Sequence, residues 1–522
     1  MAIEIVEKYV NELIDKSTLD EPVWNIEKIR AGKKASWDYI DGCMIMSLLE
    51  LYKVTGNKKY FEFSEKYIDH RIQEDGTIVG YKKDELNLDN INEGKNLFTL
   101  YDLTGKEKYA KATEKIYQQI LEMPRTKEGN FWHKKIYPNQ VWLDGLYMAQ
   151  PYYMEYENRF HDRKNYKDIF TQFFNVEKNQ KDAATGLYYH AYDSERLMFW
   201  ADKETGLSQN FWLRALGWFS MALLDTLALA DTEYPDYGHL LKMYQDLIDS
   251  MLKFQSPEGM WYQVPNFPGR EKNYLETSGS SIMAYCLMKG ARLGYLPKEY
   301  SKYGVKAFNG ICDTYLSTVE GEMSLGGICL VAGLGPDDNR RRDGTYEYYM
   351  SEPIVKDDAK GTAPFLLAYA EILRLEEDAE RRTMEKRLTD LARRVYERYQ
   401  SQLEPEYARQ LDKAIRVCEE YQQGVGNWGD MYEVVLGDDG IWVYSEGAGD
   451  FSEEVRAMWV LESELLMCSC WFGCQREQDT EPEDLEMRGE NIPAFIEYAE
   501  SLPDTLPDST QIFAYCNENL CY

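Results

Sequence analysis

The chain has 522 residues, of which 44% are hydrophobic and 14% aromatic, and its 59 Lys and Arg against 90 Asp and Glu give a formal net charge of −31. A chain of this length and composition can bury a large core, which excludes a single small module and a globally disordered chain. The excess of acid disfavours nucleic acid as a partner, because neutralising phosphates needs clustered Lys and Arg.

The acidic charge is unevenly distributed along the chain. Residues 376–522 contain 34 acidic and 13 basic residues, whereas residues 1–375 contain 56 acidic and 46 basic ones. About two thirds of the net charge therefore falls in the last part of the sequence. We predict a first unit over residues 1–375 and an acidic, mostly helical extension over residues 376–522.

The start of the chain predicts an amphipathic helix with several acids, unlike the basic, apolar beginning of a secretory signal. No run of about 18 uncharged apolar residues predicts a membrane-spanning helix. The ten Cys are scattered, and the cluster of Cys468, Cys470 and Cys474 lacks a fourth ligand at zinc spacing. We therefore expect reduced thiols, no metal, no cofactor, no membrane partner and a cytoplasmic location.

Helical repeats follow along the first unit. Residues 51–69 and 100–118 both read L-Y-x-x-T-G-x-x-x-Y followed by an amphipathic segment. The Gly predicts a left-handed cap that ends one helix, and the Tyr begins the apolar face of the next. Between such pairs, short Gly-aromatic segments near Gly76, Gly129, Gly186 and Gly259 predict hairpin-like turns.

Repeats of this kind, continuing to about Leu375, predict about six helical hairpins. The loops are rich in Trp, Tyr, His, Asp and Arg, as if several met at one pocket, which favours closure into an all-α ring, an (α/α)6 barrel. An open helical-repeat scaffold that binds protein through aromatic ridges is the alternative.

Chemically suggestive residues lie in four segments of this unit. In residues 131–153, Asp144 stands alone among Trp142, Leu143 and Leu146, so that desolvation would raise its pKa and suit it to act as a general acid. An N-cap role for Asp144 is equally compatible with the pattern, and for Asp89 capping is the favoured interpretation. His190 lies in one of the aromatic loops.

The fourth segment holds Trp212, Arg214 and Trp218. On one helix Trp212 and Arg214 diverge by about 200°, so both can reach a pocket only where that helix begins. Aromatic rings stack on sugars and a guanidinium pairs with a carboxylate, although Trp218 is equally compatible with the core.

Five ordered motifs resemble those of the unsaturated rhamnogalacturonyl hydrolases of glycoside hydrolase family 105, which is related to the unsaturated glucuronyl hydrolases of family 88. They are L-D-N-I-N-x-G-K from residue 88, W-L-D-G-L-Y-M-A-Q-P from 142, Y-Y-H-x-Y-D from 188, N-F-W-L-R-A-L-G-W from 210 and L-E-T-S-G-S-S from 275. The resemblance covers about residues 5–375.

The resemblance implies an (α/α)6 barrel without metal that releases an unsaturated uronic acid from pectin-derived oligosaccharides by hydrating its C4=C5 double bond. Asp144 matches the catalytic aspartate, and Asp89 matches a second acid that stays ionised and helps to raise the pKa of Asp144. The remaining implied substrate-binding residues are His190, Trp212, Arg214, Trp218, Trp142, His133, Lys134 and Tyr39. Either Lys134 or Arg214 would hold the uronate carboxylate.

Three rival functions stay open: an unsaturated glucuronyl hydrolase acting on glycosaminoglycan fragments, a sugar epimerase with paired His, and the non-catalytic scaffold. The resemblance does not explain residues 376–522, where we expect charged helices, a β-hairpin around the Gly-Asp-Asp-Gly of residues 437–440, a helix over residues 453–471 and a loose end. This extension could mediate homo-oligomerisation or another protein contact.

Overall fold

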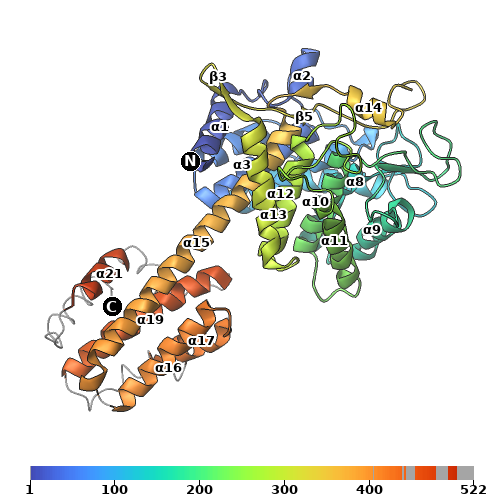
Figure 1. The fold of residues 1–522 in the computed structure, drawn as a ribbon. Helices are drawn as coiled ribbons and strands as arrows, with labels where there is room; N and C mark the ends of the chain where they lie inside the picture. Colours follow the sequence, from blue (N-terminus) through green and yellow to red (C-terminus); the bar gives the residue numbers. More distant parts are fainter. Residues whose placement is uncertain (1, 404, 438–439, 442–452, 478–491, 503–522) are drawn as a thin grey trace. The chain divides into compact units, whose positions relative to one another are not determined.

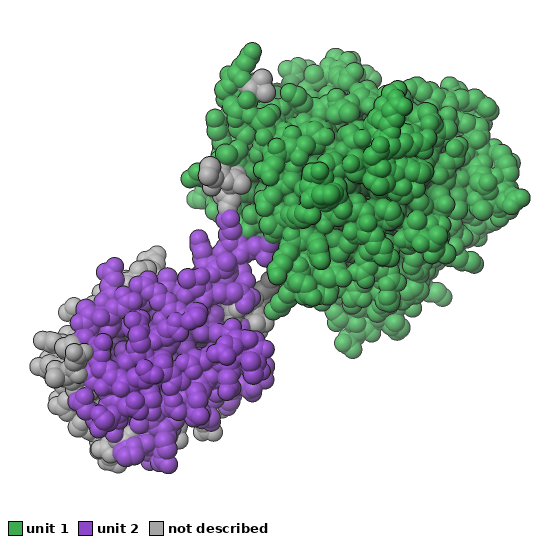
Figure 2. All heavy atoms as spheres, in the orientation of Figure 1, with its two compact units in different colours: residues 1–373 green, residues 374–522 purple. Residues whose placement is uncertain are grey.

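The structure is a computed structural model that describes residues 2–403, 405–437, 440–441, 453–477 and 492–502. The chain divides into two compact units, residues 1–373 and residues 374–522, which Figure 2 distinguishes by colour.

Helical hairpins follow one another through the first unit (Figure 1). Their helices are α3 (Tyr39–Thr55) with α4 (Lys58–Asp69), α6 (Lys95–Thr104) with α7 (Glu107–Glu122), α8 (Leu143–Phe160) with α9 (Tyr166–Gln180), α10 (Leu213–Leu229) with α11 (Tyr237–Leu252), and α12 (Thr277–Arg292) with α13 (Ser301–Tyr315). A last pair brings together α1 (Ala2–Lys16) and the start of α15 (Ala359–Tyr399), where the Tyr9 hydroxyl lies 3.2 Å from Thr362 Oγ1. The predicted all-α ring of hairpins is confirmed.

The first helix of each of the five consecutive hairpins is an inner helix of the ring, and in the last pair the inner helix is α15. In α8, α10 and α12 nearly every residue is buried, and α10 packs against both of the others. Outer helices such as α7 and α11 bury one stripe and expose the other face. This difference is expected, because only a helix surrounded by protein can be apolar around its whole circumference.

The repeated Thr-Gly motif ends inner helices as predicted. Gly56 after α3 and Gly105 after α6 both have φ of 65°, and each donates its N–H to the carbonyl of the Tyr four residues earlier. Glycine adopts this left-handed conformation at little cost. Tyr60 and Tyr109, which follow these caps, are buried on the outer helices α4 and α7.

The predicted Gly-aromatic turns are also present, as tight turns that lead from an outer helix toward the next inner one. Each is closed by backbone hydrogen bonds, such as Thr126 N to Asn130 O at 2.8 Å and Ser256 N to Met260 O at 2.8 Å. The other short elements of this unit are α2 (Ile26–Ala31), α5 (Asp89–Asn92), α14 (Tyr346–Ser351), and the antiparallel pairs β1 (Gln140–Trp142) with β2 (Ala191–Asp193), β3 (Leu316–Val319) with β4 (Glu322–Leu325), and β5 (Ile328–Cys329) with β6 (Ile354–Val355).

The second unit is helical where it is described. It contains the C-terminal part of α15, then α16 (Pro405–Gln422), α17 (Trp428–Leu436), α19 (Glu453–Glu477) and α21 (Ile492–Glu500), around a core of its own. The division between the units falls inside α15, a continuous helix, rather than in a linker.

Two predictions for the second unit are wrong. The run Met431–Leu436, read from sequence as a β-prone arm of a hairpin, is part of α17, because Met431 and Val435 lie one helical turn apart and both enter the core. The helix expected over residues 453–471 is confirmed as α19. The predicted loose end is wrong at Ile492–Glu500, which form α21, because Ile492 and Ile496 pack into the core of this unit. Residues 438–439 and 442–452 of the predicted hairpin, and most of the rest of the predicted loose end, lie outside the described residues.

In the described ranges no helix is both long and apolar enough to cross a membrane. No cluster of three or more His, Cys, Asp or Glu suited to a metal occurs among the described side chains, which include Cys468 and Cys470 but not Cys474.

Candidate active site

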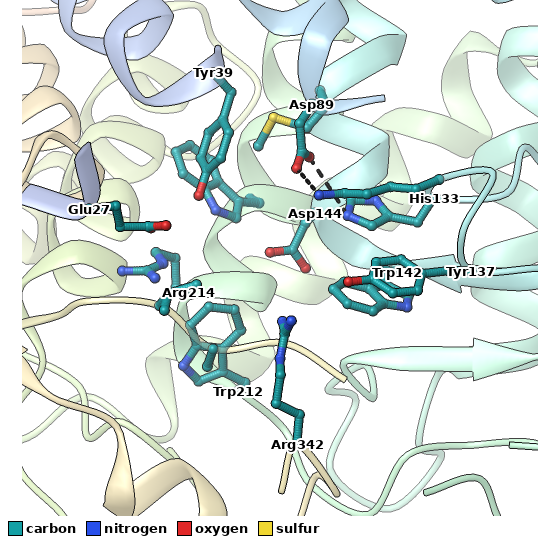
Figure 3. A pocket seen from close by; sticks show the side chains of 15 residues that line it. Glu27, Tyr39, Asp89, His133, Tyr137, Trp142, Asp144, Trp212, Arg214 and Arg342 are labelled. Atoms are coloured by element: carbon teal, nitrogen blue, oxygen red, sulfur yellow. Dashed lines mark ion pairs between the residues drawn. The ribbon is translucent and has the colours of Figure 1, made fainter. Parts of the chain in front are cut away.

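An open cavity with about 710 Å³ of empty space lies where inner helices begin (Figure 3). Asp144 is the second residue of α8 and Arg214 the second of α10, while Tyr39 begins α3 and Asp89 begins α5. The start of a helix carries partial positive charge, so several converging starts favour an anionic ligand. The cavity is lined by Glu27, Tyr39, Asp89, His133, Lys134, Tyr137, Trp142, Asp144, Met148, Trp212, Arg214, Trp218, Val331, Ala332 and Arg342.

All of the site residues predicted from sequence line this cavity except His190, which lies behind it against Asp144. His190 is fully buried, and its Nε2 is 3.2 Å from Asp144 Oδ2, close but not aligned for a hydrogen bond. Its Nδ1 is 2.7 Å from the hydroxyl of Tyr349. His190 therefore connects the carboxylate of Asp144 to a buried hydroxyl.

The capping interpretation is wrong for both aspartates. Trp142 occupies the N-cap position of α8, and Asp144 lies inside the first turn, with its carboxylate directed into the cavity. At α5, Asn87 accepts the hydrogen bond from Asp89 N at 3.0 Å, which leaves the carboxylate of Asp89 directed at Lys134. Both carboxylates are thus available to the cavity.

The prediction of a raised pKa for Asp144 was also wrong. Burial, the largest influence, does raise the pKa, but His190 and then His133 act in the opposite direction. Together they outweigh burial and leave the pKa of Asp144 below its ordinary value, because the imidazoles beside the carboxylate stabilise its ionised form. Asp89 is not among the main influences on this pKa, so its predicted effect is not found either.

Asp89 forms an ion pair with Lys134, whose Nζ lies 2.6 Å from Asp89 Oδ2. His133 Nε2 lies 3.7 Å from Asp89 Oδ1, yet burial lowers the pKa of His133 to about 4. The imidazole of His133 is consequently neutral at physiological pH. Its ring stacks on Trp142 at 4.5 Å, and Trp142 stacks on Tyr137 at 4.9 Å, which gives the cavity an aromatic wall.

On the opposite side, Trp212 and Arg214 both reach the cavity because they lie where α10 begins, as predicted. Arg214 Nη1 donates to Cys329 O at 2.5 Å and to Ser278 Oγ at 3.2 Å. Within the described part of the chain, the indole Nε1 of Trp212 has no hydrogen-bond partner. Trp218 stacks on Tyr147 at 4.9 Å and also lines the cavity, so it contributes to both core and site.

A buried acidic group joins the helices that carry Tyr39 and Asp89. Glu93, directly after α5, accepts a hydrogen bond from Asp38 N at 2.7 Å, and Asp38 caps α3. Asp41, one turn into α3, accepts from Trp24 Nε1 at 3.0 Å and has its pKa raised to about 7, first by burial and then by Asp38. These contacts fix α3 and α5 relative to each other.

Sequence reasoning missed several residues of the site. They are Glu27, Tyr137, Met148, Val331, Ala332, Arg342 and, behind His190, Tyr349. Glu27 is paired with Lys360 at 2.6 Å. The run of three arginines at 340–342 was the one local signal that could have pointed to Arg342.

Comparison with known proteins agrees with this architecture. The sequence model of Glycosyl Hydrolase Family 88 matches residues 8–376. Protein Atu3128 of Agrobacterium fabrum is 39% identical over 233 residues, which cover 44% of this chain and 99% of that protein. The unsaturated rhamnogalacturonyl hydrolase YesR of Bacillus subtilis is 27% identical over 308 residues, which cover 58% of this chain and 83% of that protein.

Solved structures share the ring. A family 105 glycoside hydrolase of C. acetobutylicum has a TM-score of 0.65 and 42% identity, with 71% of this chain and 98% of that chain covered. The unsaturated glucuronyl hydrolase of Bacillus sp. GL1 has a TM-score of 0.51 and 15% identity, with 71% and 97% covered, which supports the fold alone.

Proposed function

This chain belongs to glycosyl hydrolase family 88, and we propose that it removes the terminal 4,5-unsaturated uronic acid from rhamnogalacturonan-derived oligosaccharides by hydrating the C4=C5 bond. The similarity to a protein named as an unsaturated rhamnogalacturonyl hydrolase supports the pectic substrate. The converging helix starts and the cations of the cavity suit an anionic sugar.

One observation carries the proposal. Of the three carboxylates that line the cavity, Asp89 is paired with Lys134 and Glu27 with Lys360, whereas Asp144 has no Lys or Arg partner among the described residues. Its neighbour is His190, whose Nε2 lies 3.2 Å from Asp144 Oδ2. Asp144 is therefore the carboxyl group best suited to exchange protons with a substrate.

The proposed reaction needs one acid that later acts as a base. Asp144 donates its proton to C4 of the double bond, and positive charge develops at C5, next to the ring oxygen. A water molecule adds to C5 and returns a proton to Asp144. The hemiketal that results opens at its bond to the ring oxygen, and the hemiacetal left at C1 then releases the aglycone. This route differs from displacement at C1, which uses two carboxylates.

His190 and Tyr349 would supply Asp144 with its proton. The lowered pKa of Asp144 means that a standing protonated population, expected from sequence, does not explain catalysis. His190 Nε2 lies 3.2 Å from Asp144 Oδ2, and a proton on this nitrogen can pass to the carboxylate once substrate binding aligns the two groups, while the Tyr349 hydroxyl holds the other side of the ring.

The remaining residues would bind the sugar. Asp89, held by Lys134, can accept hydrogen bonds from hydroxyls, and Trp212 Nε1 can donate one. The stacked wall of His133, Trp142 and Tyr137 offers a face to the apolar side of a sugar ring.

The test is to incubate the protein with unsaturated oligosaccharides made by lyases and to follow the ultraviolet absorbance of the conjugated double bond. We expect absorbance to fall with rhamnogalacturonan products. A fall only with glycosaminoglycan products would instead support the glucuronyl hydrolase alternative, and no fall with either would refute the proposed activity.

A further inference from the structure

We propose that Arg342 binds the carboxylate of the unsaturated uronic acid and so makes the enzyme specific for the free acid over its ester. This inference rests on the proposed function and names a residue that the sequence patterns did not indicate. Neither Lys134 nor Arg214, the two cations predicted for this role, is as available for it.

Among the described residues that line the cavity, the cations differ in whether a protein group already engages them. Lys134 is engaged by Asp89 at 2.6 Å. Arg214 is fully buried and directs its Nη1 and Nη2 atoms at the carbonyls of Cys329 and Leu330. Arg342, in contrast, lines the cavity and forms no ion pair with a carboxylate in the described part of the chain, where the groups that act on its guanidinium are the side chains of Tyr137 and Tyr348. A guanidinium in this position can pair with a carboxylate through two parallel hydrogen bonds.

The local backbone aims Arg342 at the cavity. Its carbonyl accepts a hydrogen bond from Gly335 N at 2.8 Å, and Asn210 Nδ2 binds the carbonyl of Gly344 at 2.8 Å, which ties the loop to the segment before α10. The side chain passes so close to Gly333 that a Cβ there would lie 1.7 Å from Arg342 Nη2. Glycine at 333 is therefore needed for this path.

The three consecutive arginines of this loop have different surroundings. Arg340 lies 4.9 Å from the ring centre of Phe199, and Arg341 pairs with Glu352 at 2.8 Å. Only Arg342 of the three lines the cavity, where its guanidinium lies 6.0 Å from the ring centre of Trp142.

The chemistry of the substrate determines where its carboxylate must lie. The carboxylate carbon is bonded to C5, and C5 is bonded to C4, the atom that Asp144 protonates in the proposed reaction. The binding cation must therefore lie close to Asp144. In Figure 3 the guanidinium of Arg342 points toward the carboxylate of Asp144, with open space between them. A carboxylate bound by Arg342 would place C5 and the adjoining C4 next to the carboxyl group of Asp144.

The experiment compares an unsaturated disaccharide with its uronate methyl ester, as kcat/KM in the full chain and in Arg342→Met. The ester alters the reactivity of the double bond equally in every variant, so a change in the acid-to-ester ratio reports recognition. We expect the ratio to fall about 10- to 100-fold in Arg342→Met, through loss of activity on the acid. An unchanged ratio, or equal losses on acid and ester, would overturn the proposal.

Two further variants make the test decisive. Arg340→Met removes the same charge from an arginine whose side chain is 68% exposed, and it should keep the wild-type ratio. Gly333→Ala keeps Arg342 but forces its guanidinium to shift, so the ratio should fall in the same direction as in Arg342→Met, by a smaller factor. This variant keeps the proposal testable if Arg342→Met folds poorly. Wild-type protein that is inactive on every unsaturated uronide would refute the proposed function itself, an outcome distinct from an unchanged ratio.

Discussion

His133 should be neutral across the physiological pH range, and this property can be measured directly. Its side chain is 3% exposed, and burial lowers its pKa from 6.5 to about 4. Because the folded pKa is below the unfolded one, the unfolded chain binds the extra proton, and stability is lost as pH falls from 6.5 toward 4. Each pKa unit corresponds to 1.36 kcal/mol, so His133 should lower the free energy of unfolding by about 3 kcal/mol over this pH range.

The assay is nuclear magnetic resonance of the full chain labelled at histidine, which should give five ring signals because the sequence has five His. His133→Gln identifies the signal of His133, and His239→Gln, at a half-exposed histidine paired with Glu177, serves as the control. We expect the His133 signal to stay constant between about pH 8 and about pH 5.5, where ordinary histidines titrate. A His133 midpoint near 6.5 would refute the argument that burial dominates here.

Three substitutions test other parts of the account. Asp144→Asn should lower activity by at least about 10²- to 10⁴-fold with little change in thermal stability, and a collapse of the fold would contradict the absence of a capping role. His190→Ala leaves burial as the main influence on Asp144 and raises its pKa, so the alkaline limb of kcat/KM should move to higher pH; a limb that does not move would remove His190 from this role. Gly145→Ala places a Cβ 2.9 Å from His133 Nδ1 and should lower the free energy of unfolding by about 1–3 kcal/mol, measured by chemical denaturation. A gain in stability would contradict the close packing of His133 against this helix.

The helical hairpins of the ring could be predicted because the features that end a helix are encoded by neighbouring residues. The Thr-Gly repeat predicts a helix end at Gly56 and at Gly105, since the left-handed cap depends only on neighbouring residues. The same reasoning failed at residues 431–436, a short, mostly apolar run that fits a strand or a helix equally. In the structure, Met431 and Val435 pack into the core of the second unit, and this packing favours the helix.

Prediction of the site succeeded where motifs lie at helix starts and failed where the fold brings distant segments together. Asp144 could be recognised from its apolar neighbours, but its pKa could not be, because His190 comes from the connection between α9 and α10, far along the chain. Arg342 comes from a late loop and Tyr349 from α14, which follows it, and the path of this segment is set by contacts such as Asn210 with Gly344. No periodicity in the sequence encodes such contacts.

The central claim, that Asp144 initiates hydration of the double bond rather than cleavage at C1, is tested most directly with a sulfur-linked substrate. An unsaturated uronide whose glycosidic oxygen is replaced by sulfur should lose its ultraviolet absorbance at a rate similar to the oxygen-linked compound, and Asp144→Asn should act on neither. Hydration leaves the glycosidic atom unprotonated in its first step, whereas direct displacement depends on protonating it. Rapid cleavage of the oxygen compound beside an inert sulfur compound would contradict the account.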